Sequence, residues 1–277
     1  MIQVLGAGAI GAGLGGLLQR AGHEVTYIAR GEHLAAMRDH GLLLRTPRWS
    51  ERLTVNTATH VEGDGLVLLA VKSHHLDAVL PQLVGRRVLV CMNGLENEDR
   101  VAEVASQVHP AMVYVPSQHM VPGTVDLHGS PHVGVVDTDD EELAVLLRSA
   151  GLDSVATPDI WAWKRAKAIT NLCGALQVLG RHFNEVGPLM DEGQRVFAGA
   201  GLQHKSVAEL LDRVGAFELG LIEGEERVGG STRQDALRSR PLESAWLNGH
   251  FCRMGLEHGV PTPINDALMA ALQAPRP

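Results

Sequence analysis

A glycine-rich stretch at the start of the chain constrains the fold more than any other feature. Gly6, Gly8 and Gly11 follow the short apolar run of residues 2–5, and apolar residues recur at helical spacing behind them, namely Ile10, Leu14, Leu17, Leu18 and Ala21. A strand, a G-x-G-x-x-G turn and a helix in this order are typical of a dinucleotide-binding fold. The first glycine allows a tight turn, the second lets a pyrophosphate approach the backbone, and the third lets the helix pack on the strand.

The same turn is the predicted phosphate site. Backbone N–H groups at the start of a helix, together with the helix dipole, favour a bound anion. We therefore expect cofactor contacts from Gly6, Gly8, Ala9, Ile10 and Gly11. The alternative is a glycine-rich turn that binds no ligand.

The end of the second predicted strand indicates which dinucleotide would bind. Residues 23–29 form this strand, and an NAD site would place Asp or Glu near its end to bind the ribose 2′-hydroxyl. Arg30 stands there instead, and its guanidinium can bind a 2′-phosphate through two hydrogen bonds. The sequence thus favours NADP(H) over NAD(H). Glu32 lies two residues further on, and an Arg30 that merely faces solvent is the alternative.

Length and composition indicate a globular protein with more than one domain. The chain has 277 residues, 45% of them hydrophobic, and a mean hydropathy near zero. No apolar run approaches the roughly 18 to 20 residues of a membrane span. A strand directly after Met1 leaves no room for a signal peptide, so we expect a cytoplasmic protein without a membrane partner.

Charge and residue spacing exclude other classes of function. The net charge of −8 and the lack of a basic stripe argue against a nucleic-acid partner. The 14 histidines show no metal-site spacing, so no metal is expected. Three scattered cysteines predict reduced thiols: Cys91, Cys173 and Cys252. Among 24 basic residues, the lysines stand out by their rarity, which points to a need for their titratable amine: Lys72, Lys164, Lys167 and Lys205.

The order of predicted elements indicates an α/β protein with two domains. Strands and helices alternate through residues 1–156, which predicts a Rossmann-type doubly wound sheet that binds NADP(H), with finishing strands between residues 111 and 136 that could be antiparallel. Residues 157–277 read as an all-helical domain for the substrate and the catalytic groups. Its predicted helices cover about residues 158–183, 190–200, 206–223 and 241–258, with a short one ending near residue 272.

Two polar residues follow predicted strands of the sheet. Lys72 comes directly after the strand of residues 66–71, and Asn93 follows the strand of residues 86–91. Ligands of open α/β sheets bind at the carboxyl ends of the strands. An ammonium and a carboxamide there could bind the nicotinamide ribose and the substrate. The alternative is a solvated lysine and a simple Asn-Gly turn.

A helix of the second half carries the candidate acid. Lys164, Lys167 and Asn171 fall on one face because spacings of three, four and seven residues align on a helix. Lys167 could protonate a carbonyl oxygen while hydride reaches the carbonyl carbon, with Asn171 orienting the amine or the substrate. The alternative is the solvated face of an amphipathic helix.

The chain resembles the ketopantoate reductase family, the NADPH-dependent 2-dehydropantoate 2-reductases. The likeness spans nearly the whole chain and is carried by Gly6-Ala-Gly-Ala-Ile-Gly11, Ala29-Arg30-Gly-Glu-His-Leu, Val71-Lys72, Asn93-Gly94-Leu95, Lys167 four residues before Asn171, Ser231 twelve before Glu243, and His258-Gly-Val-Pro-Thr-Pro263. The resemblance implies a site in the cleft between a Rossmann and a helical domain. It implies Lys167 as general acid and Glu243 as a hydrogen-bond partner of the substrate's hydroxyl, with binding assisted by Lys72, Asn93, Asn171 and Ser231.

For two of these residues, local structure offers an explanation other than substrate binding. Glu243 follows Pro241 in the first turn of a predicted helix, where capping alone could explain a carboxylate. Ser231 lies in a predicted glycine-rich loop, where turn chemistry could explain a serine. The helical surface could support a homodimer.

One departure from the family concerns the substrate. The family typically carries a second Asn four residues after the first, where this chain has Ala175, and the usual Pro-Asn-Gly turn is missing from residues 176–184. Losing a buried polar contact costs about 1 to 3 kcal/mol, enough to change substrate preference. We therefore predict reduction of a small 2-oxo acid, first of all ketopantoate. A reductase of another ketone or imine, or a non-catalytic NADP(H)-sensing module, are the alternatives.

Overall fold

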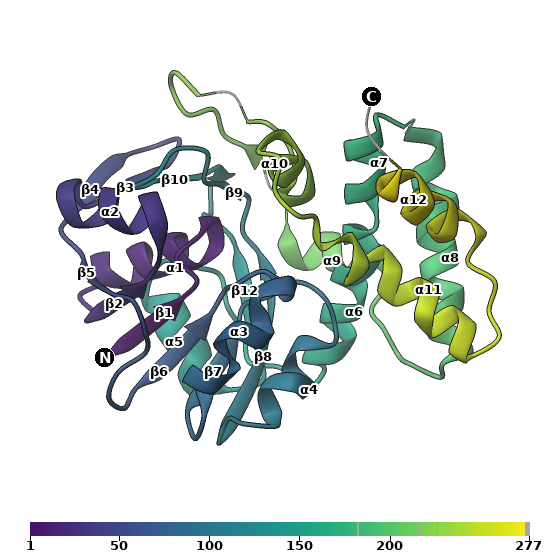
Figure 1. The fold of residues 1–277 in the computed structure, drawn as a ribbon, viewed down its shortest axis with the longest axis horizontal. Coiled ribbons are helices and arrows are strands. Elements are labelled where there is room, and N and C mark those ends of the chain that lie inside the picture. Colours follow the sequence, from purple (N-terminus) through teal and green to yellow (C-terminus); the bar gives the residue numbers. More distant parts are fainter. Residues whose placement is uncertain (182, 216–217, 226, 275–277) are drawn as a thin grey trace. The chain divides into compact units, whose positions relative to one another are not determined.

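The computed structural model describes residues 1–181, 183–215, 218–225 and 227–274, and the chain divides into two compact units (Figure 1). Unit 1 consists of Met1–Met92, Glu96–Ile160 and Val214–Arg227, and unit 2 of Asn93–Leu95, Trp161–Arg213 and Val228–Pro277. The sequence placed one boundary at residue 157, close to the junction after Ile160. In the structure the chain also changes unit at residues 93–95 and 214–227, far from that boundary.

Unit 1 is built on a seven-stranded sheet with the strand order β12-β8-β7-β6-β1-β2-β5. The strands are β1 (Ile2–Leu5), β2 (Val25–Ile28), β5 (Asn56–Ala58), β6 (Leu66–Leu69), β7 (Arg87–Val90), β8 (Gln107–Tyr114) and β12 (Val135–Thr138). Neighbouring strands are parallel except for β12, which runs antiparallel to β8. The predicted doubly wound sheet is confirmed. An antiparallel strand finishes it only from residue 135 onward, whereas residues 117–118 and 124–127, which were expected to finish it, form strands of a second sheet.

Helices cover both faces of this sheet because its strands are apolar on both sides. Alternate residues such as Val4 and Leu68 pack with α1 (Ala9–Arg20) and α5 (Glu141–Ser149). The residues between them, such as Leu5 and Leu69, pack with α3 (Leu76–Val79) and α4 (Asn97–Ala102). Continuous apolar runs are typical of parallel strands buried on both faces. This burial places the glycine turn after β1 at the edge of a rigid core.

The remaining elements of unit 1 lie beside this core. A second sheet has the order β4-β3-β10-β9, with β3 (Leu42–Arg45), β4 (Ser50–Leu53), β9 (Ser117–Gln118) and β10 (Thr124–Leu127), and α2 (Gly31–His40) connects β2 to β3. The helix predicted over residues 75–83 is broken into η1 (Ser73–His75), α3 and η2 (Leu80–Leu83), where Pro81 lacks the N–H that a continuous helix needs.

A segment from the second half of the chain joins unit 1. Strand β13 (Glu218–Leu219) pairs antiparallel with β11 (Gly129–Ser130). Arg45 donates hydrogen bonds to Asp126 at 2.7 Å and to Glu225 at 2.8 Å, which adds an ionic contact to this pairing. The helix predicted over residues 206–223 is therefore wrong beyond Val214, where α9 (Val207–Val214) ends. Residues 216–217 of that prediction lie outside the described part of the chain.

Unit 2 is helical, as predicted. Its helices α7 (Cys173–Leu179), α8 (Val186–Gly199), α11 (Asn248–Glu257) and α12 (Pro263–Gln273) lie side by side, and α10 (Ser231–Leu237) packs on α7 (Figure 1). Their shared core includes Leu172, Leu189, Phe197, Phe251 and Leu268. The single helix predicted over residues 158–183 is two helices, since α6 (Ile160–Asn171) ends before α7 begins; residue 182 lies outside the description. Among the described residues, no helix is both long and apolar enough to cross a bilayer.

Candidate active site

The glycine turn is shaped by the close approach of two strand ends in unit 1. Gly6 has a φ of +97°, and a Cβ atom there would lie 2.8 Å from the carbonyl of Ala70 and from Val71 Cγ1, at the end of β6. A Cβ on Gly11 would lie 2.2 Å from the carbonyl oxygen of Gly6. Both positions therefore exclude side chains, which brings the start of α1 directly against the ends of β1 and β6.

The second glycine leaves room for a ligand. Gly8 is the N-cap of α1, and a Cβ added there would meet no atom within 4 Å. Gly8, Ala9 and Ile10 are partly exposed, whereas Gly11 is buried. The turn thus offers open space in front of the N–H groups of the first helical turn, which fits a pyrophosphate. Of the five residues predicted here, Gly11 contributes by packing.

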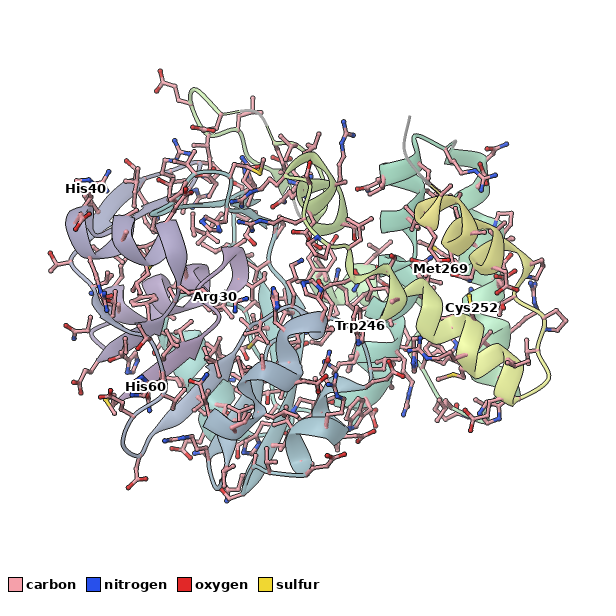
Figure 2. All side chains as sticks on the ribbon, in the orientation of Figure 1. Arg30, His40, His60, Trp246, Cys252 and Met269 are labelled. Atoms are coloured by element: carbon pink, nitrogen blue, oxygen red, sulfur yellow. The ribbon has the colours of Figure 1, made fainter. Side chains whose placement is uncertain are left out.

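Arg30, labelled in Figure 2, is the N-cap of α2, two residues beyond the end of β2, and its side chain is exposed. Its backbone is extended, with φ −147° and ψ 165°. Glu32 lies in the first turn of α2 and is also exposed. The structure therefore presents the predicted guanidinium to solvent at the carboxyl end of β2, the edge where the glycine turn follows β1.

Lys72 lies at the same edge of the sheet. It follows β6 in an extended conformation as the N-cap of η1, and its side chain is partly buried. The next residue in the sequence, Ser73, is 2% exposed and accepts a hydrogen bond from Asn97 Nδ2 at 3.3 Å. This buried contact holds the turn that carries Lys72.

Three predicted residues form a hydrogen-bonded row in unit 2. Lys167 Nζ donates to Asn171 Oδ1 at 3.0 Å, and Asn171 Nδ2 donates to Asn93 Oδ1 at 3.1 Å. Lys167 and Asn171 come from successive turns of α6, whereas Asn93 comes from the short stretch Asn93–Leu95 that belongs to unit 2. We call Lys167, Asn171 and Asn93 the polar row. Its bond between Asn93 and Asn171 joins two residues that lie 78 positions apart in the sequence.

Burial changes the chemistry of the lysine. Desolvation disfavours the charged ammonium and lowers the pKa of Lys167 from 10.5 to about 8. Lys164, one turn earlier, is only 4% exposed, and its Nζ lies 6.0 Å from the ring centroid of Trp161. A solvated helix face, the alternative for this stretch, does not describe these two amines. An amine with a pKa near 8 can donate a proton close to neutral pH.

Glu243 and Ser231 lie in different environments. Glu243 begins the 3-10 helix η4 (Glu243–Ala245) and is 5% exposed. The helix predicted from Pro241 starts only at Asn248, so Glu243 does not cap it. Ser231 is exposed at the first residue of α10, where the sequence had predicted a loop.

Ala175 lies in the apolar core of unit 2. It is 1% exposed and packs in the same cluster as Leu172, Leu176 and Phe251. Helix α6 ends at Asn171 and α7 begins at Cys173, so Ala175 belongs to the next helix and not to the one that carries Lys167 and Asn171. The departure from the family at residue 175 therefore falls within the apolar core of unit 2.

The buried polar residues of unit 2 that sequence reasoning missed include a hydrogen-bonded set of three. Glu192, Asn248 and Asn265 are 0%, 1% and 0% exposed. They occupy core positions of their helices among apolar residues. The sequence can show this only when the ends of each helix, and the face that it buries, are known. Elsewhere, the described residues contain no group of three histidine, cysteine or acidic side chains placed to bind a metal.

Comparison with known proteins identifies the family. Residues 2–138 match the family model described as ketopantoate reductase PanE/ApbA, and residues 163–276 match the model of its C-terminal domain. The chain belongs to the ketopantoate reductase family. A 2-dehydropantoate 2-reductase of Archaeoglobus fulgidus is 27% identical over 296 residues, covering 97% of this chain and 95% of the relative.

Solved structures agree with this assignment. A PanE/ApbA family ketopantoate reductase from Ralstonia eutropha is 30% identical, with a TM-score of 0.83 over 98% of this chain and 97% of that one. A ternary structure of D-mandelate dehydrogenase with NADH and anilino(oxo)acetate shares the fold, with 23% identity, a TM-score of 0.82 and coverage of 96% and 95%. The protein is thus an oxidoreductase of the ketopantoate reductase type. The predicted cofactor, NADP(H), is confirmed at the level of this family.

Proposed function

We propose that this protein reduces a small 2-oxo acid to the 2-hydroxy acid with NADPH, and that 2-dehydropantoate is its substrate. The observation that carries the proposal is the polar row, in which a lysine with a pKa of about 8 is bonded to Asn171 and through it to Asn93. The names of the relatives, 2-dehydropantoate 2-reductases over almost the full length, support the choice of substrate.

In the proposed mechanism Lys167 supplies the proton. NADPH, when bound, supplies the hydride that reaches the ketone carbon, and the ketone oxygen takes a proton from the Lys167 ammonium, which becomes a neutral amine. An ammonium has three N–H donors, so Lys167 can keep its bond to Asn171 while it donates to the ketone oxygen. A pKa near 8 leaves it protonated at neutral pH yet able to give up the proton readily. Water then restores the proton.

The other predicted residues have binding roles in this proposal. Asn171 holds the amine in place through its carbonyl oxygen and leaves its amide to Asn93. We propose that Glu243 accepts a hydrogen bond from the substrate's hydroxyl, and that Ser231, Asn93 and Lys72 bind substrate and cofactor. Glu243 is 5% exposed in η4, and burial of this kind suits a group that orients the substrate.

The cofactor proposal for this chain is NADPH, held at the glycine turn with its 2′-phosphate on Arg30. The open space at Gly8 and the exposed guanidinium at the end of β2 support it. A homodimer is proposed for the assembly, since a structural neighbour is described as a dimeric ketopantoate reductase from Staphylococcus aureus.

The test is an assay of NADPH oxidation with 2-dehydropantoate, other 2-oxo acids and imines, using wild-type protein, Lys167→Ala and Lys167→Arg. Both variants should lose turnover by about 1,000-fold, because positioned proton transfer contributes factors of this order. The dissociation constant of NADPH should stay unchanged. Lys167→Arg keeps the positive charge but cannot release its proton, so it separates charge from acidity.

Three results would contradict the proposal in different ways. Wild-type turnover in Lys167→Ala would remove the lysine from the mechanism. Faster reduction of another ketone or an imine would replace 2-dehydropantoate as the substrate. Tight NADPH binding with no turnover of any compound would favour the NADP(H)-sensing module.

A further inference from the structure

A chain of buried hydrogen bonds connects three helices of unit 2 to the junction between α6 and α7. It begins at Glu192 on α8, passes through Asn265 on α12, and reaches Asn248, the first residue of α11. All three side chains are at most 1% exposed. Buried polar groups are costly unless they are hydrogen-bonded, so the partners of each group are informative.

Glu192 holds the start of α12. Its Oε2 accepts a hydrogen bond from Ile264 N at 3.0 Å, and its Oε1 accepts from both Asn265 N and Asn265 Nδ2 at 2.8 Å. These N–H groups belong to the first turn of the helix, which has no partners within the helix itself. A carboxylate on one helix thus caps another.

The carboxylate also sets the orientation of both amides. An ionised carboxylate only accepts, so Asn265 must turn its Nδ2 toward Glu192 and its Oδ1 toward Asn248. Asn248 Nδ2 donates to that Oδ1 at 2.9 Å and also to the carbonyl oxygen of Leu172 at 3.1 Å. Donation therefore runs outward from the Asn248 amide, through Asn265 to Glu192 on one side and to the main chain on the other.

Leu172 is the point where α6 gives way to α7. It directly follows Asn171 of the polar row, and the backbone bonds around it are long and span only three residues: Leu172 N to Ile169 O and Ala175 N to Leu172 O, both 3.3 Å. A helix breaks where a side chain enters its hydrogen-bond pattern. Asn248 supplies a side chain at this break, because its amide donates to the carbonyl oxygen of Leu172, whose bond from Ala175 N is 3.3 Å long.

Asn248 also lies close in sequence to Glu243, the buried glutamate proposed to bind the substrate. Asn248 comes five residues after Glu243, and Leu247 N donates to the carbonyl oxygen of Glu243 at 3.1 Å. Cys252 and Met269, labelled in Figure 2, mark α11 and α12, which pack against each other and carry Asn248 and Asn265. One amide thus ties the turn that bears Glu243 to the end of the helix that bears Lys167 and Asn171.

We infer that Asn248 is a positioning residue for reduction: held by Glu192 and Asn265, it sets the end of α6 and thereby the placement of Asn171 against Lys167. The inference rests on the proposed function for its catalytic readout. It adds a residue that neither the glycine motif nor the spacing of Lys167 and Asn171 indicated.

The first experiment compares Asn248→Ala with Leu268→Ala. Leu268 lies on α12 in the same core, is 0% exposed and takes no part in the polar chain, so its truncation is a matched loss of packing. Asn248→Ala should lower kcat by about 100-fold, since small displacements of a catalytic group cost factors of this size. Its NADPH affinity should stay at the wild-type value. Leu268→Ala should lose thermal stability and keep kcat, measured at a temperature where both variants are folded.

A double-mutant cycle asks whether Asn248 acts through Asn171. If it does, kcat of Asn171→Ala combined with Asn248→Ala should equal that of Asn171→Ala alone, because the second change has nothing left to misplace. Losses in log kcat that simply add would overturn the inference, as they would show two independent effects. Leu268→Ala combined with Asn171→Ala is the control in which addition is expected.

A titration that needs no turnover separates this inference from the proposed function. The chain has only four lysines, so ¹³C-labelled lysine methylenes can be followed by NMR and Lys167 assigned with Lys167→Arg. Asn248→Ala should lower the pKa of Lys167 below its wild-type value, because the Asn171 oxygen that stabilises the ammonium moves away. Leu268→Ala should leave that pKa unchanged. If wild-type protein reduces no 2-oxo acid, the proposed function fails while this titration still decides the positioning role; an unchanged pKa in Asn248→Ala would overturn it.

Discussion

The glycine turn of unit 1 and the polar row of unit 2 are built in opposite ways. The turn comes from six consecutive residues and works through backbone, because Gly6 and Gly11 have no room for side chains and Gly8 leaves open space. The row works through side chains, and its members Asn93, Lys167 and Asn171 come from separate parts of the sequence. A backbone site is local and can be read as a motif, whereas a side-chain site depends on how distant segments pack.

Because of this difference, we expect the glycine turn to control cofactor affinity and the polar row to control kcat. A backbone cradle stabilises a bound anion before any reaction, so damage to it should appear as lost cofactor affinity. An acid acts as charge changes in the reaction, so damage to the polar row should appear in kcat. Substitutions and pH can test this division in order of expected effect.

Among the variants that test cofactor affinity, the largest effect is expected for Gly11→Ala. Its Cβ would lie 2.2 Å from the carbonyl oxygen of Gly6, so the turn must shift. Overpacking of this kind costs about 1 to 3 kcal/mol, and we expect NADPH affinity to fall by up to about 100-fold, measured by fluorescence titration.

Two further glycine variants control this result. Gly187→Ala lies near the start of α8 and meets no atom within 4 Å, so NADPH affinity should not change. Gly8→Ala also meets no protein atom, so it should keep thermal stability and still lose affinity, because its Cβ enters the space proposed for the phosphates. Wild-type affinity in both Gly8→Ala and Gly11→Ala would remove the turn as the cofactor site.

Arg30→Ala should have the next largest effect, and it should be selective. A hydrogen bond to a charged group contributes about 1.5 to 3 kcal/mol, so NADPH affinity should fall by about 10- to 100-fold. NADH affinity should stay the same, because NADH lacks the 2′-phosphate. Arg38→Ala, at the other end of α2, is the matched control and should change neither affinity. Equal losses for NADPH and NADH would contradict a role of Arg30 in phosphate recognition.

The smallest effect is a pH dependence confined to the polar row. The pKa of Lys167 is lowered to about 8 by burial, and the proposed acid must be protonated to act. The rate constant kcat should therefore be level below pH 8 and fall about tenfold for each pH unit above it. NADPH affinity should not follow this profile. A kcat that stays level up to pH 10 would exclude Lys167 as the acid.

Local sequence signals explain both the successes and the misses of the fold prediction. The apolar runs of β1 and β6 and the glycines between strand and helix are local, and they were predicted correctly. Helix α5 was missed, although Asp140 caps it by accepting a hydrogen bond from Leu143 N at 2.9 Å and two glutamates open its first turn. These residues could have predicted the start of α5 from the sequence alone. Strand β13 could not be predicted in this way, because its two residues form a strand only by pairing with β11.

The candidate site divides in the same way. Helical spacing alone placed Lys167 and Asn171 on one face of α6, and their hydrogen bond agrees with it. The contact of Asn171 with Asn93, the burial of Glu243 and the inward position of Ala175 required the packed structure. Ala175 shows why, because it lies on α7, which the helical spacing of Lys167 and Asn171 on α6 does not describe.

By itself, the sequence determined the parallel sheet, the glycine turn, the arginine at the end of β2 and the phase of the lysine helix, because strand and helix periods and turn chemistry act over a few residues. Tertiary structure alone decided which distant side chains meet. It brought Asn93 to Asn171, lowered the pKa of Lys167 by burial, and joined Glu192, Asn265 and Asn248 to the end of α6. Contacts of this kind depend on how helices pack against one another, and no spacing within a single segment records that packing.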